Sequence, residues 1–188
     1  MKATETLMSE HRVIERVIQA LEIAASHLEQ GGSVRPGFFV DAADFIKGFA
    51  DGCHHKKEEG VLFKALEEAG LPADEGPVGV MLFEHEEGRA FTRAMREAAL
   101  KMAQDPSARE AVIENARGYA SLLRGHILKE DRILFPMAEG LIPFGRQERV
   151  AEDFLRVEHE ETGEGVHEKY LALAAALEGE AAHLLTEA

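Results

Sequence analysis

The stretch that decides the fold is HHKKEEGVLF at residues 54–63, because much of it returns as HILKEDRILF at residues 126–135. The two stretches lie 72 residues apart and carry His, Lys, Glu, an acid and Leu-Phe at the same offsets. A His and a Glu four positions apart lie on one face of an α-helix, about 6 Å apart along its axis. A single pair of this kind is usually a solvated helix surface. Two pairs in one frame, each followed by Leu-Phe, indicate equivalent helices that turn the same polar pair toward a shared interior.

Two further histidines stand alone on other predicted helices. His11 follows Glu10 and His85 follows Glu84, so the two Glu-His pairs lie 74 residues apart. Each histidine lies at helical spacing from apolar residues, which places it on the apolar stripe of its helix. A lone histidine on such a stripe is more often part of a core, but four of them with two carboxylates favour a metal site. The candidate metal ligands are His11, His54, Glu58, His85, His126 and Glu130.

Glycine and proline residues divide the chain into helical stretches. We expect helices over about residues 4–29, 36–69, 76–104, 105–139 and 146–177. The connections between them are short, which favours antiparallel neighbours. The sequence therefore predicts an all-α fold. It consists of an up-down four-helix bundle over residues 1–145 and an additional C-terminal helix, within residues 146–188, packed on the bundle.

Four imidazoles and two carboxylates suit a dinuclear metal site. If Glu58 and Glu130 each bridge two ions, each ion receives two imidazole nitrogens and two carboxylate oxygens. A solvent-derived oxo or hydroxo bridge adds a fifth ligand and leaves an open position on each metal. Mixed nitrogen and oxygen ligands with open positions suit iron, with manganese or zinc as substitutes. We therefore expect two iron ions, which also remove the cost of burying the two carboxylates.

The composition excludes several classes of partner. The 188 residues include 35 acidic and 21 basic side chains, a formal net charge of −14, so neither nucleic acid nor an anionic membrane is an expected partner. No apolar run approaches the length of a membrane span, and no secretory signal is visible. The one cysteine, Cys53, cannot form an internal disulfide, which fits a reducing compartment. We expect a cytoplasmic protein.

Over about residues 5–140, the chain resembles the hemerythrin-like HHE cation-binding proteins. The shared pattern is a His on the first helix, His-x-x-x-Glu on the second, His on the third and His-x-x-x-Glu on the fourth. The resemblance implies a non-haem di-iron centre inside a four-helix bundle, whereas ferritin-like bundles carry Glu-x-x-His. The oxygen-carrying hemerythrins use a fifth histidine, four residues after the His of the third helix, where this sequence has Arg89. The resemblance therefore implies that both metals have an open position.

The expected ligand of such a centre is a small diatomic molecule or peroxide. The missing fifth histidine disfavours simple reversible oxygen carriage and favours sensing or redox chemistry with oxygen, nitric oxide or peroxide. A binding module would hold or sense the ligand. A di-iron redox enzyme would turn over peroxide or nitric oxide with an external electron donor, or donate iron for iron–sulfur cluster repair. A metal-regulated structural bundle would act through its surface, but bridging carboxylates exceed what a structural zinc site needs.

A second register for the second helix is offered by His55 and Glu59. The repeat disfavours it, because only His54 and Glu58 place Leu-Phe at the offsets found in the fourth helix. In an α-helix His55 lies about 100° around the axis from His54, so we expect it to point away from the metals. Glu59 is expected to lie off the ligand face for the same reason, and Cys53 is expected to be a small buried packing residue.

Two other features have competing interpretations. Tyr119 lies two turns before His126 on the same face, where it either fills the core or donates a hydrogen bond near the open metal positions. In the predicted C-terminal helix, Glu158 and His159 repeat the Glu84-His85 pair at the same 74-residue interval. A solvated remnant of a duplicated unit is favoured there over a lid or a second metal site that includes His159 and His167.

Overall fold

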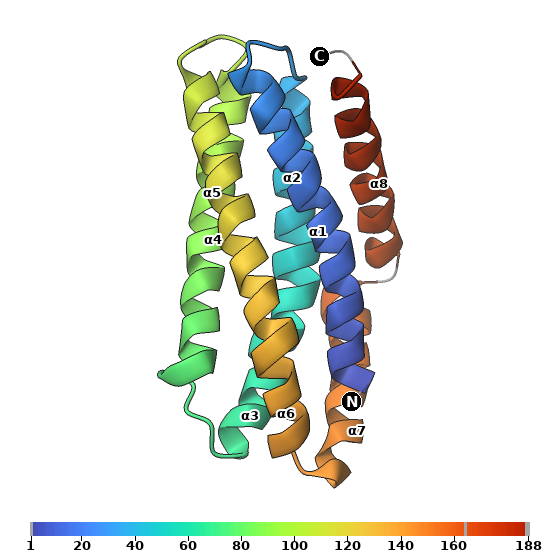
Figure 1. The fold of residues 1–188 in the computed structure, drawn as a ribbon. Helices are drawn as coiled ribbons and strands as arrows, with labels where there is room; N and C mark the ends of the chain where they lie inside the picture. The colour runs from blue at the N-terminus through green and yellow to red at the C-terminus, as the bar shows by residue number, and fades with distance from the viewer. Residues whose placement is uncertain (1, 164, 187–188) are drawn as a thin grey trace.

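The computed structural model describes residues 2–163 and 165–186, which form helices and no strand (Figure 1). The elements are α1 (Lys2–Glu29), α2 (Pro36–Phe45), η1 (Ile46–His55), η2 (Glu58–Leu62), α3 (Phe63–Glu68), α4 (Gly76–Lys101), α5 (Ala108–Lys129), η3 (Glu130–Leu134), α6 (Phe135–Leu141), α7 (Phe144–Arg156), η4 (Val157–Thr162) and α8 (Val166–Leu184). The η elements are π-helical segments. Among the residues described, no helix combines the length and the apolar character that a bilayer crossing requires.

Four long helical columns form the bundle, and the predicted all-α fold is confirmed. The first and third columns are α1 and α4. The second column runs from α2 through η1 and η2 to α3, and the fourth runs from α5 through η3 to α6. Successive columns point in opposite directions (Figure 1), and α5 packs against both α1 and α4.

The C-terminal extension differs from the single helix expected over residues 146–177. It consists of α7 with η4 and, after an interruption, α8. Gly163 and Gly165 lie in the interruption with φ angles of 95° and 78°, a backbone conformation that glycine adopts at little cost and that ends a helix. α7 contacts α1 and η2, and α8 contacts α1 and α2, so both parts of the extension pack on the bundle (Figure 1).

The 72-residue repeat extends to the backbone. The π-helical segments η2 and η3 begin at Glu58 and Glu130, and both end at the leucine of Leu-Phe. Such i→i+5 segments are rare and are frequently found at functional sites. The third π-helical segment of the bundle, η1, breaks the repeat, because the corresponding residues 118–127 belong to the α-helical α5.

The interior consists of two apolar clusters separated by a buried polar layer. One cluster includes Ile14, Phe49, Met95 and Leu123. The other includes Leu7, Leu62, Met81 and Phe135. All four columns contribute to both clusters and carry buried polar side chains between them. On α1, for example, His11 lies between Leu7 of one cluster and Ile14 of the other.

Candidate metal centre

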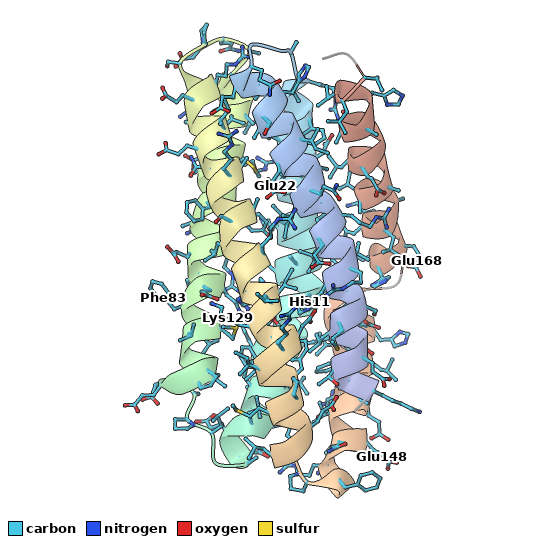
Figure 2. The ribbon with its side chains drawn as sticks, viewed as in Figure 1. His11, Glu22, Phe83, Lys129, Glu148 and Glu168 are labelled. Atoms are coloured by element: carbon cyan, nitrogen blue, oxygen red, sulfur yellow. The ribbon has the colours of Figure 1, made fainter. Side chains whose placement is uncertain are left out.

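The polar layer brings all six predicted ligands together. One group consists of His11, His54, Glu58 and Glu130, whose potential ligand atoms lie within 4.8 Å of one another. Glu58 also belongs to a second group with His85 and His126, within the same limit. All of these side chains are buried, and Figure 2 shows His11 in the interior of the bundle.

Both carboxylates contact histidines from the two halves of the bundle. The Oε1 atom of Glu58 lies 3.3 Å from Nε2 of His54, and its Oε2 atom lies 3.5 Å from Nε2 of His85. The Oε2 atom of Glu130 lies 3.2 Å from Nε2 of His11 and 3.2 Å from Nε2 of His126. Each carboxylate therefore connects a histidine of one half with a histidine of the other.

The outer nitrogens of these four histidines donate hydrogen bonds to carboxylates. The Nδ1 pairs are His11 with Asp131 at 2.7 Å, His54 with Glu10 at 2.9 Å, His85 with Glu59 at 2.7 Å and His126 with Glu84 at 3.0 Å. This arrangement fixes the tautomer, orients the ring and leaves Nε2 as the donor atom of a metal ligand. Glu59, expected to lie off the ligand face, is thus not itself among the clustered ligands but orients His85.

The unpaired polar atoms of the layer provide a test of whether the site fits metal ions. Every carboxylate oxygen of Glu58 and Glu130 is buried without a hydrogen-bond partner among the described residues, and so is Nε2 of His11 and His54. The Nε2 atoms of His85 and His126 face each other at 3.2 Å. Leaving such groups unsatisfied in a core is costly. Cations at the two groups would give these atoms their missing partners, so the residues fit a dinuclear metal.

The electrostatics of the layer favour the same conclusion. Burial alone would lower the pKa of His54, but the charges and hydrogen bonds of Glu58 and Glu10 together outweigh burial and raise that pKa to about 10. Glu130, Glu84 and Glu58 together have the same effect on His126, whose pKa is also raised to about 10. Both carboxylates have a lowered pKa in spite of their burial, because histidines face them. The two carboxylates of the layer therefore stay ionised and need positive charge between them. Protons and metal ions compete to supply that charge.

His55, which was expected to point away, lies in the layer. It joins Glu58, His85 and His126 in the second group of potential ligands. Its ring stacks on that of His85 with centroids 3.7 Å apart, and its Nδ1 donates to Asp51 at 2.9 Å. Burial and the neighbouring histidines hold the pKa of His55 well below its usual value, so the ring is neutral.

The π-helical backbone of η1 accounts for this difference. A π-helix has more residues per turn than an α-helix, so successive side chains are separated by less than the 100° of the α-helix. His54 and His55 therefore both reach the interior. A sequence signal was present, because the repeat pairs His55 with Ile127 and so marks it as an unmatched histidine.

Arg89 occupies the position of the oxygen carriers' fifth histidine and contacts the outer carboxylates. One of its terminal nitrogens lies 2.6 Å from Glu59, and its Nε lies 3.3 Å from Asp51. Burial raises the pKa of Asp51 to about 6, against the opposing charge of Arg89. Arg89 thus links the carboxylates that accept hydrogen bonds from His55 and His85.

The remaining side chains singled out in the sequence lie around this centre. Tyr119 is buried in the larger apolar cluster, and its hydroxyl has no hydrogen-bond partner among the described residues. Cys53 is buried, as expected, and groups with Glu10, Glu158 and His167 within 4.8 Å. Lys57 already supplies a positive charge there, because its Nζ contacts both Glu10 and Glu158. His159 is exposed, in keeping with a solvated surface.

Comparison with known proteins agrees with the geometry. Residues 2–138 match the family described as the hemerythrin HHE cation-binding domain. The chain is 27% identical over 163 residues to uncharacterized proteins of Mycobacterium tuberculosis and Mycobacterium bovis, an alignment that covers 86% of this chain and 63% of each relative. The chain thus spans a little under two thirds of the length of these relatives. No solved structure matches it.

Proposed function

The chain belongs to the hemerythrin HHE cation-binding family, and from this premise we propose that it holds two iron ions and binds or senses oxygen, nitric oxide or peroxide there. The observation that carries the proposal is the set of buried, unpaired nitrogen and oxygen atoms on the first, second and fourth columns, together with the facing Nε2 atoms of His85 and His126. Their arrangement supports iron because imidazole and carboxylate ligands with open positions suit non-haem iron, with manganese or zinc as substitutes.

The proposed ligands of one ion are His11 and His54, and those of the other include His85 and His126, with Glu58 and Glu130 bridging the two. Residues 1–145 form the unit that holds the metals, and residues 146–188 extend it. When bound, iron supplies a redox-active centre with room for an exogenous ligand. The apolar clusters on both sides keep bulk water out of the layer, and the outer carboxylates hold the imidazoles in place.

The first experiment is metal reconstitution without oxygen, followed by iron analysis and optical titration of the reduced protein with nitric oxide and with oxygen. We expect two iron ions per chain and a spectral change with each gas. His54→Ala and His126→Ala should each lose most of the affinity for one ion. His159→Ala removes an exposed histidine and is the matched control.

One iron ion or fewer per freshly reconstituted chain would contradict the dinuclear proposal. If the protein binds two ions but its spectrum does not change with nitric oxide, oxygen or peroxide, the result would instead favour a metal-regulated structural bundle. Continuous consumption of peroxide or nitric oxide with an added electron donor would assign the protein to the enzymes. We propose that it works in the cytoplasm, which the single cysteine fits.

A further inference from the structure

We infer that His55 is a seventh metal ligand, so that the two metal positions are unequal and one of them is the entry point for an exogenous ligand. The inference rests on the proposed dinuclear centre and deepens it. The position with His85 and His126 would receive three imidazoles. The position with His11 and His54 would receive two and keep the open coordination site.

The contacts of His55 match those of the four other histidines. Its Nδ1 donates to a carboxylate, that of Asp51, at 2.9 Å. Its Nε2 is buried without a hydrogen-bond partner among the described residues, and the ring offers a nitrogen within 4.8 Å of ligand atoms of Glu58, His85 and His126. A histidine placed in this way has its outer nitrogen occupied and its inner nitrogen free to bind a metal.

The opposite half offers no equivalent of His55. The repeat places Ile127 at the corresponding position, and this side chain is buried in the larger apolar cluster. The π-helical segment that turns His55 inward also has no counterpart, because residues 118–127 are α-helical. An isoleucine cannot bind a metal, so the His11–His54 position lacks a third imidazole.

Arg89 supports this assignment from the third column. It contacts Asp51, the partner of His55, and Glu59, the partner of His85. One guanidinium therefore positions the carboxylates behind two neighbouring imidazoles. The sequence has no fifth histidine at the expected place on α4. The second column supplies the third imidazole instead, as His55, and Arg89 of α4 orients it through Asp51. Both metals were expected to be open, and the structure instead favours one saturated and one open position.

The test compares the wild-type protein with His55→Ala, His55→Gln and the repeat-matched control Ile127→Ala, all loaded with ⁵⁷Fe. We expect two unequal Mössbauer doublets in the wild type and one azide bound per centre. His55→Ala should weaken the binding of one ion by about tenfold or more in chelator competition and allow a second azide to bind. Added imidazole should restore the wild-type doublets. Ile127→Ala should keep the wild-type doublets and azide stoichiometry.

His55→Gln keeps most of the side-chain volume and the donor to Asp51 but removes the imidazole nitrogen, so it repeats the test if the alanine variant does not fold. Two iron ions with the wild-type doublets and a single azide in both His55 variants would overturn the inference and leave the proposed function standing. Fewer than two iron ions in the wild-type protein would contradict the proposed function itself.

Discussion

The two halves of the bundle share their inner chemistry and differ in what surrounds it. In each half a Glu-His pair on one column meets Lys, His and Glu on the next, and a π-helical segment begins at the buried glutamate, Glu58 or Glu130. The differences are one unmatched position within the repeat and the burial of one matched position. The first half has His55 where the second has Ile127, and its lysine, Lys57, is 0% exposed whereas Lys129 is 38% exposed. In the proposed centre, the repeated residues supply the ligands that the two metal positions share in kind, and the unmatched His55 makes these positions unequal.

The strongest test of the shared chemistry concerns the bridging carboxylates. Glu58→Ala and Glu130→Ala should each abolish the proposed bridged centre, because each glutamate contacts a histidine of both halves and would serve both ions. Iron content and magnetic coupling measured by Mössbauer spectroscopy in an applied field report this loss. Glu22→Ala, which removes a surface carboxylate paired with Arg124, should retain the centre. A variant that keeps two coupled ions would show that its carboxylate does not bridge.

The lysines test the difference in burial between the halves. Lys57→Met leaves Glu10 and Glu158 without their shared cation, and breaking a buried pair costs about 3–5 kcal/mol of unfolding free energy. Lys129→Met breaks a more exposed pair with Glu84 and should cost less than about 1 kcal/mol. Urea denaturation of the two variants measures both values. Equal losses of unfolding free energy would mean that the greater burial of Lys57 does not strengthen its contacts with Glu10 and Glu158.

The outer carboxylates Asp131 and Glu59 allow a matched comparison. Asp131 accepts a hydrogen bond from His11, and Glu59 accepts one from His85. Removing such a partner lowers metal affinity by about 10–100-fold. Asp131→Ala should lower the affinity for the ion beside His11, and Glu59→Ala should lower the affinity for the ion beside His85. Chelator competition measures both affinities. An unchanged affinity in Glu59→Ala would restore the sequence-based expectation that this residue lies outside the site.

The smallest effect is expected from Glu158, which is found only beside the first half. Glu158→Gln removes a partly exposed charge from Lys57 and leaves the contact of Lys57 with Glu10 in place. We expect the unfolding free energy to fall by less than about 1 kcal/mol, with iron content unchanged. A loss as large as that of Lys57→Met would make η4, and not Glu10, the main partner of the lysine.

The sequence was sufficient for the columns and for the six clustered residues, because the helical period and the repeat both report which side chains share a face. It was not sufficient for His55, since the period assumes α-helical geometry and η1 departs from it. It also missed the roles of Asp131 and Glu59, whose partners lie on other columns and are set by packing. The interruption before α8 could be predicted in part from the sequence, because Gly163 and Gly165 lie in it.

The position of the polar layer between two apolar clusters has a consequence for the unfolded chain. Residues 11, 54, 85 and 126 are far apart in the sequence, and ions held in common by them would close several long loops at once. The unfolded chain does not hold these residues together, so the ions would bind the folded chain and their binding free energy would add to its stability. The one cysteine of this chain cannot form an internal disulfide. Bound metals would therefore be the cross-links between its helices, and a chelator would remove these cross-links and lower the stability of the fold.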